Sequence, residues 1–270
     1  MMQVVSLDNV TVVKNNEVIL DRISFEVEMG SFVYVIGNNA SGKSTLIKTI
    51  GGLLKYSGYI NINGYYLDDV GVNSIRENVS TVLSDIDEEI LGNTVWDNLV
   101  MPLIFLNKSE SYIKKRVADI CSLLKINKRI LNKKMVLVDD SLRKKILIAS
   151  AIISKPSILL LDDVLNKMSF DDKQLVLTAL NKIRNEENMT IIMATNNVED
   201  IFSGDYVIVL NQGKMVMNDK IKGVFSNINK LKECGFNLPF VVELSLFLLD
   251  KGLIDNIYVD ERKLVDALWK

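Results

Sequence analysis

Residues 37–45 read Gly37-Asn38-Asn39-Ala40-Ser41-Gly42-Lys43-Ser44-Thr45, and the apolar run 32–36 comes directly before them. This order fits the Gly-x-x-x-x-Gly-Lys-Ser pattern at every fixed position. The apolar run predicts a buried parallel strand, and residues 44–54 predict the helix that follows it. In that setting the loop amides and the helix start bind phosphate, Lys43 reaches the β- and γ-phosphate oxygens, and the Ser44 hydroxyl binds magnesium. The sequence therefore predicts a nucleoside triphosphate site, and the alternative is a glycine-rich turn that buries a lysine.

A pair of aspartates at 162 and 163 forms a second motif. The run 157–161 predicts a buried strand, and Asp162 and Asp163 come at its end. In phosphate-loop enzymes an acidic residue at such a strand end holds the magnesium ion, which makes Asp162 the expected ligand. The alternative is that the aspartates cap the element that follows them. Because a phosphate loop lies upstream, the magnesium interpretation is favoured.

Composition excludes several other classes of protein. The chain has 270 residues, with 32 basic and 34 acidic side chains and a formal charge of −2, which argues against nucleic acid as a partner. The longest apolar runs, 99–106 and 146–153, are far shorter than the roughly 20 residues that span a bilayer. Residues 1–6 lack the features of a secretory signal. We therefore expect a soluble or membrane-peripheral protein.

The chain contains no histidine, which removes histidine-based metal sites, Ser/His/Asp triads and histidine general bases together. Its two cysteines, Cys121 and Cys234, are far apart in the sequence. This usage predicts buried intracellular thiols rather than a disulfide framework.

Hydrophobic periodicity divides the chain into four parts. An antiparallel start is predicted from short strands at 10–13, 18–20 and 23–27, and a hairpin with an Asn-Gly turn at 58–65. A helical insertion follows at about 90–150, where Thr94 and Asp97 form a capping pattern and 109–124 carries an apolar stripe. Strands return at 158–161, 190–193 and 206–210, with helical patterns at 170–187 and 198–202. The tail, 221–270, is mostly helical in pattern, with a helix-start signal at 237–239.

Taken together, these motifs resemble an ATP-binding cassette (ABC) ATPase: a phosphate loop, a helical insertion, the acidic strand, and then 195–197 after another strand. The tail segments 231–244, 252–253 and 261–268, together with 90–99, are similar to the ATP-binding subunits of energy-coupling-factor (ECF) transporters. The resemblance implies an α/β fold, a P-loop NTPase ABC cassette with a mixed sheet core, an antiparallel β subdomain and a helical subdomain. It implies a nucleotide-binding domain at 1–220, a small helical C-terminal extension at 221–270, and ATP and Mg²⁺ as cofactors.

Several positions depart from the family's pattern. The family's glutamine after strand 79–83 falls on Ser84, which the resemblance makes a metal-side residue with a shorter reach. The signature loop falls on 138–142, where two aspartates replace the residues that offer donors to a partner's ATP. The alternative for this pair, and the favoured one, is that Asp139 and Asp140 cap their helix.

The catalytic residues implied by the resemblance are also altered. The catalytic glutamate falls on Asp163, whose carboxylate is retracted by one methylene, and general-base geometry is strict. The switch histidine falls on Asn196, which can donate to a phosphate oxygen but cannot become a cation. The dimer-loop aspartate falls on Ser169, and the adenine-stacking aromatic falls near Val13 or Lys14. We expect nucleotide binding to be kept and turnover to be reduced.

The resemblance implies the ATP-binding subunit of an ECF-type importer, which couples ATP to uptake of a vitamin or metal ion. Its expected place is the cytoplasmic side of the cell membrane, as a peripheral subunit. Expected partners are a second ABC ATPase, in a heterodimer rather than a homodimer, a transmembrane coupling subunit and a substrate-binding membrane subunit. Apolar residues recur at helical spacing in the tail and predict burial against a partner or the cassette, or within the tail itself: Phe240, Val241, Leu244, Phe247 and Leu248.

Three other functions stay open at this point. The first is a structural subunit that binds nucleotide without hydrolysing it. The second is a cassette protein that acts on ribosomes or DNA, which the single cassette and the lack of basic excess disfavour. The third is a phosphate-loop GTPase or small-molecule kinase, which the importer-like tail disfavours.

Overall fold

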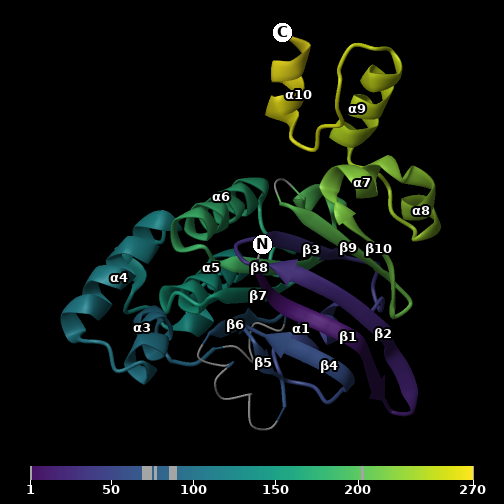
Figure 1. Ribbon diagram of the computed structural model, residues 1–270. Helices are drawn as coiled ribbons and strands as arrows, with labels where there is room; N and C mark the ends of the chain where they lie inside the picture. Colours follow the sequence, from purple (N-terminus) through teal and green to yellow (C-terminus); the bar gives the residue numbers. More distant parts are fainter. Residues whose placement is uncertain (1, 69–74, 76–77, 85–89, 202–203, 270) are drawn as a thin grey trace.

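The computed structural model describes residues 2–68, 75, 78–84, 90–201 and 204–269. Its centre is a six-stranded sheet in the order β10-β9-β3-β8-β7-β6 (Figure 1). Five neighbouring strands, β9, β3, β8, β7 and β6, run parallel, and β10 pairs antiparallel with β9. Their bounds are β3 Phe32–Ile36, β6 Val79–Val82, β7 Ile158–Asp162, β8 Thr190–Thr195, β9 Tyr206–Asn211 and β10 Lys214–Lys220. The predicted strands at 32–36, 158–161, 190–193 and 206–210 are confirmed, and β10 was not foreseen.

A four-stranded antiparallel sheet, in the order β2-β1-β4-β5, packs against this core. Its strands are β1 Gln3–Lys14, β2 Glu17–Glu28, β4 Ser57–Ile62 and β5 Tyr65–Tyr66. The separate strands predicted at 18–20 and 23–27 were wrong, because β2 runs through both. The pairing with β1 shifts between Val12↔Leu20 and Val10↔Ile23, and Arg22 takes a φ of 50°. A bulge thus carries the polar residues that looked like a break.

Helices cover the central sheet and form the insertion (Figure 1). Helix α1, Lys43–Ile50, starts at the phosphate loop and is shorter than predicted. The insertion contains α3 Val95–Phe105, α4 Glu110–Leu123 and α5 Asp140–Ile153, with short 3₁₀ turns at Lys128–Ile130 and Met135–Leu137. Helix α6 is Phe170–Glu187, as predicted, whereas 198–202 forms only the 3₁₀ turn Val198–Asp200, and residue 202 lies outside the described residues. Among the described residues, no helix is both long and apolar enough to cross a membrane.

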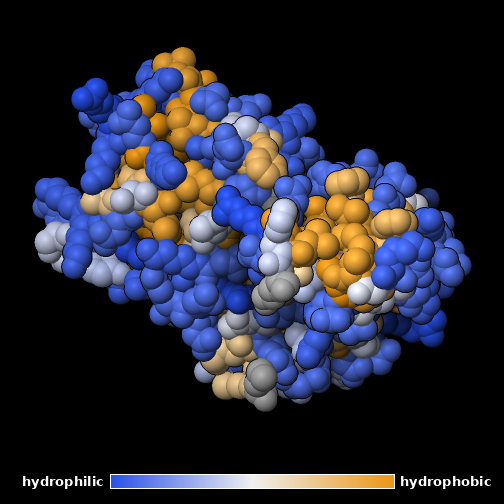
Figure 2. All heavy atoms as spheres, turned by 90° about the horizontal axis from the view of Figure 1, so that it is seen from above, coloured by the Kyte–Doolittle hydropathy of each residue, from blue (hydrophilic) through white to orange (hydrophobic). Residues whose placement is uncertain are grey.

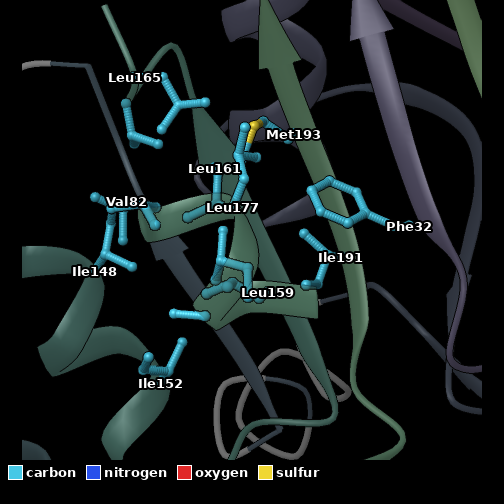
Figure 3. Close-up of a cluster of buried hydrophobic side chains, with 14 of the residues drawn as sticks. Phe32, Val82, Ile148, Ile152, Leu159, Leu161, Leu165, Leu177, Ile191 and Met193 are labelled. Carbon is cyan, nitrogen blue, oxygen red and sulfur yellow. The ribbon is translucent and has the colours of Figure 1, made fainter. Parts of the chain in front are cut away.

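Two hydrophobic cores lie on opposite faces of the central sheet. Successive side chains of a strand point to opposite faces, and β7 divides accordingly. Leu159 and Leu161 join the core shared with α5 and α6, where Figure 3 shows them beside Ile148, Ile152 and Leu177. Ile158 and Leu160 join the core shared with α1 and the antiparallel sheet. Strands buried on both faces explain the unbroken apolar runs in the sequence.

The described residues of the tail, 221–269, form four helices: α7 Ile221–Ser226, α8 Ile228–Glu233, α9 Phe240–Asp250 and α10 Glu261–Leu268. The helix-start signal at 237–239 is confirmed, since Pro239 is the N-cap of α9. Its predicted apolar stripe is only partly buried: Phe240 is 72% and Phe247 59% exposed, whereas Val241, Leu244 and Leu248 are half-buried. Packing inside the tail therefore accounts for only part of this stripe, and the contact that covers Phe240 and Phe247 stays a prediction. Both cysteines are free and buried, as expected.

The entrance to the insertion depends on a buried polar residue. The predicted cap is confirmed: Thr94 and Asp97 form a reciprocal capping box at the start of α3. One turn on, the side chain of Asn98 is fully buried, accepts from the backbone N–H of Leu91 and Gly92, and donates to Gly92 O and Thr94 O at 2.8 and 2.7 Å. Asn98 therefore ties the segment before α3 to its first turn.

We predict that Asn98→Ala lowers the free energy of unfolding by about 2 to 4 kcal/mol, because it leaves several partly buried backbone groups without their hydrogen-bond partner. Urea unfolding followed by circular dichroism measures the change. Asn185→Ala, at an exposed position of α6, is the matched control and should change stability by less than about 0.5 kcal/mol. Equal unfolding midpoints for the two variants would contradict this role of Asn98.

Candidate functional site

The phosphate loop joins the end of β3 to the start of α1, as predicted. Gly42, at the N-cap of α1, has a φ of 103°, and a Cβ there would lie 2.6 Å from Leu20 Cδ2. A Cβ on Gly37 would lie 2.1 Å from Ser41 Oγ. Both fixed glycines are thus required by the close approach of neighbouring atoms, and Gly42 also by its conformation.

The ammonium group of Lys43 is held inside the loop. It donates to Gly37 O at 2.6 Å and to Asn38 O at 2.9 Å, and these carbonyls account for two of its three protons among the described residues. Burial lowers the pKa of Lys43, while the nearby carboxylates of Asp163 and Asp162 oppose that effect. The loop therefore keeps a buried cation at the position that the motif assigns to phosphate contact.

Asp162 accepts from two serine hydroxyls that come from different elements. Its side chain is fully buried, and its two carboxylate oxygens accept from Ser44 Oγ at 2.9 Å and from Ser84 Oγ at 3.2 Å. Burial raises the pKa of Asp162, and the hydrogen bonds from Ser44 and Ser84 oppose that rise. The structure thus brings together the three residues that the sequence assigned to the metal.

The donor set fits a magnesium ion bound together with phosphate. Magnesium prefers oxygen ligands and commonly takes one or two carboxylates, with phosphates and water completing its shell. Among the described residues no group of three or more His, Cys, Asp or Glu could hold a metal alone. The Ser41 hydroxyl is buried in the loop and is without a hydrogen-bond partner there. An orphaned hydroxyl of this kind is consistent with a loop shaped for an additional acceptor.

Asp163 is fixed by its backbone and by a neighbour that sequence reasoning missed. It adopts a φ of 50°, its N–H donates to Ala194 O at 2.9 Å, and its Oδ2 accepts from Asn166 Nδ2 at 3.0 Å. The Asn166 carbonyl in turn accepts from the buried ammonium group of Lys144. Burial lowers the pKa of Lys144, and the nearby Asp163 carboxylate opposes this. Lys144 stands in the basic run 143–145, just before the apolar run 146–153, so the sequence pattern gave no signal that it would be buried here.

Asn196 lies beside the phosphate loop, where its Nδ2 is 3.4 Å from Asn39 Oδ1. A shallow hollow at this place is lined by Asn38, Asn39, Asn196 and Asn197. Asp200 anchors the segment 195–197, because its carboxylate accepts from Thr195 Oγ1 at 3.1 Å and pairs with Lys173 at 2.7 Å. The structure therefore brings Asn196 to the edge of the phosphate loop.

The degenerate signature residues act within their own chain. Asp139 is the N-cap of α5 and accepts from Leu142 N at 3.0 Å, which confirms the capping interpretation. Ser141 donates to Asp172 Oδ2 at 2.6 Å, and hydrogen bonds from Lys145 and then Ser141 lower the pKa of Asp172. Ser169, at the position of the dimer-loop aspartate, is the N-cap of α6. These side chains stabilise helix starts in this chain.

Comparison with known proteins identifies the family. A family model described as ABC transporter matches residues 20–166. This chain belongs to the ABC transporter family. It is 30% identical over 235 residues to the energy-coupling factor transporter ATP-binding protein EcfA of Pediococcus pentosaceus, covering 87% of this chain and 84% of that protein. It is 28% identical to the protein of the same name from Enterococcus faecium, covering 93% and 90%. The predicted resemblance is therefore confirmed, and the chain is an ABC-type ATPase.

Solved structures confirm the cassette fold. The cbiO1 subunit from Clostridium perfringens, part of the ABC transporter complex cbiONQ, superposes with a TM-score of 0.75 at 22% identity, covering 88% of this chain and 97% of that one. The ATP-binding cassette MJ0796, in a dimeric post-hydrolysis state with ADP and Pi, has a TM-score of 0.75 at 25% identity, covering 81% and 99%. Both likenesses support the predicted α/β cassette.

We predict that Lys43→Ala weakens ATP binding by about ten- to a hundredfold, because it removes a cation that would make charge-assisted bonds to phosphate. Equilibrium titration with a fluorescent ATP analogue measures the affinity. Lys55→Ala, at an exposed position after α1, removes the same charge elsewhere and should bind normally. Unchanged affinity in a folded Lys43→Ala variant would remove Lys43 from the site.

Proposed function

We propose that this chain is the ATP-binding subunit of an ECF-type importer and couples ATP binding and hydrolysis to uptake of a vitamin or metal ion. The observation that carries the proposal is the convergence of Lys43, Ser44, Ser84 and Asp162 at one end of the central sheet. The similarity to curated ECF ATP-binding proteins extends over most of the chain and supports the same assignment.

Each residue of the site has a role in this proposal. Lys43 and the amides of loop 37–45 bind the phosphates, and Ser44 and Asp162, with Ser84, hold magnesium. A bound magnesium ion would neutralise negative charge on the phosphates. Asp163 is the residual general base, and the Asn196 amide donates to a phosphate oxygen. Asn166 limits the freedom of the Asp163 side chain, because Asn166 Nδ2 already donates to Asp163 Oδ2.

The proposed assembly places nucleotide head to tail between two cassettes, as a peripheral complex on the cytoplasmic side of the membrane. Its other members are a transmembrane coupling subunit, which would dock near Ser84, and a substrate-binding membrane subunit.

The start of α5 favours a heterodimer over a homodimer. It presents Asp139 and Asp140, and a carboxylate close to a partner's phosphates is repulsive. A second cassette with an intact signature loop would relieve that repulsion at one of the two sites.

A second candidate is a subunit that binds nucleotide and supports the complex without hydrolysing it. The engagement of Asp139 and Ser141 in contacts within their own chain favours this candidate. Phosphate release in a single turnover and at steady state, measured for this chain alone and with its partner cassette, separates the two. If this chain's own site carries out multiple turnovers and Asp163→Asn abolishes them, the result supports hydrolysis. If the site carries out no multiple turnovers, the result supports the structural role.

We predict that the isolated chain turns over ATP at less than about 1 per second and that Asp163→Glu raises this rate by less than about tenfold. The longer side chain of glutamate restores the reach of the carboxylate, but the φ of 50° at position 163 disfavours a residue larger than aspartate. Adding Asp139→Ser, Asp140→Gly and Asn196→His should give a gain larger than the product of the separate gains, because these groups act on one transition state.

Steady-state phosphate release measures each variant. Asp171→Glu, an exposed change of the same kind at the start of α6, is the control and should leave the rate unchanged. A wild-type homodimer that hydrolyses ATP at about 1 to 1000 per second would contradict the prediction of reduced turnover.

We also predict that the exposed face of the tail contacts the partner cassette. Figure 2 looks down on the tail and shows hydrophobic side chains gathered there. The exposed side chains of the tail include Phe240 and Phe247. Phe240→Ser with Phe247→Ser should weaken association, because the contact would lose buried apolar area. Sedimentation velocity of this chain with the co-expressed second cassette measures their association.

The matched control is Tyr59→Ser with Tyr66→Ser, which removes two exposed aromatic side chains from the antiparallel sheet. This control should associate as the wild type does. Unchanged association after truncation of 240–270 would rule out the tail contact.

A further inference from the structure

The tail is bonded directly to the phosphate loop. Asn38 Nδ2 donates to the carbonyl oxygen of Cys234 at 2.6 Å, across 196 residues of sequence. Asn38 is a variable position of the loop motif, and the motif therefore assigns no role to its side chain. The contact is partly buried, which makes it less exposed to competition from water than a surface hydrogen bond.

The tail side of the contact is rigidly built. Helix α8 ends at Glu233 with Cys234 as its C-cap, and Gly235, with a φ of 77°, follows. Backbone hydrogen bonds from Gly235 N to Lys232 O and from Phe236 N to Leu231 O close the turn. Leu231, Cys234 and Phe236 are buried in the core that underlies the central sheet. A Cβ on Gly235 would lie 2.6 Å from Asn38 Nδ2. The turn thus aims the Cys234 carbonyl at the loop, and a side chain at position 235 would have to displace the Asn38 amide.

The loop side of the contact leads to the phosphate-binding cation. The backbone carbonyl of the same Asn38 accepts from Lys43 Nζ at 2.9 Å and from Ser41 N at 3.1 Å. One residue is therefore held by the tail through its side chain and holds Lys43 through its backbone. A shift of Asn38 would move the carbonyl that orients the ammonium group.

We propose that the Cys234–Gly235 turn is a positioning element for nucleotide binding: through Asn38, it holds the phosphate loop in the shape that receives ATP. This inference rests on the proposed function in one respect, that the loop binds the phosphates of ATP. Coupling between two sites is reciprocal, so bound ATP stabilises the turn to the same extent as the turn favours ATP.

Two glycine substitutions in the full-length chain test the proposal. Gly235→Ala places a methyl group against Asn38, whereas Gly252→Ala, at a φ of 67°, has no atom within 4 Å of the added methyl among the described residues. Both glycines have a positive φ, 77° and 67°, so alanine is strained at either position, but only Gly235→Ala disturbs the contact. Gly235→Ala should weaken binding of a fluorescent ATP analogue by about two- to tenfold, the range expected for one hydrogen bond, and Gly252→Ala should bind as the wild type does.

A double-substitution cycle shows whether the effect passes through Asn38. In an Asn38→Ala background, adding Gly235→Ala should cause no further loss of affinity. Hydrogen exchange supplies a readout that does not need a folded Gly235→Ala variant. ATP should slow exchange of the Gly235 and Phe236 amides in the wild type, and this protection should be lost in Asn38→Ala.

Equal affinities for Gly235→Ala and Gly252→Ala, or unchanged exchange at Gly235 and Phe236 on adding ATP, would overturn the inference while leaving the ATP site intact. Failure of the proposed function has a different signature. In that case the wild type and Lys43→Ala would bind the ATP analogue equally poorly, and the tail variants would not differ from them.

Discussion

The phosphate loop depends on a buried ammonium group that the loop itself must satisfy. Lys43 donates to two loop carbonyls, and its charge lies close to the carboxylates of Asp162 and Asp163. Leaving such a cation without partners would be costly, so the loop backbone is constrained to turn its carbonyls inward. Turning the carbonyls inward closes the loop around the lysine. The two glycines, the start of α1 and the position of β7 can all be understood as conditions for that arrangement.

The substituted residues of the family's site are engaged elsewhere in the fold. Asp139 caps α5, and Ser141 donates to Asp172. Each of these substituted residues makes a contact that fits the fold of this chain, independently of its effect on the rate of ATP hydrolysis. Restoring the family's residue at one of these positions therefore exchanges a structural contact for a catalytic one. Stability and activity should be measured together for such variants.

The sequence predicted the parts of the molecule that depend on local pattern. The phosphate loop, the Thr94 capping box and α6 follow from residues close together in the chain, and they lie where the pattern placed them. The continuous strand β2 was missed because a polar pair in a bulge looks the same as a polar pair in a turn. Contacts such as that of Lys144 with Asn166 depend on elements that meet only after folding.

The two-sided burial of β7 limits how this protein can change in length. Its residues alternate between the core with α5 and α6 and the core with α1, and the strand ends in Asp162. Inserting or deleting one residue within the strand would exchange the two sets of side chains and turn the carboxylate of Asp162 away from Ser44. Length variation between relatives should therefore be confined to the connections, such as that between α4 and α5, where no such alternation has to be kept.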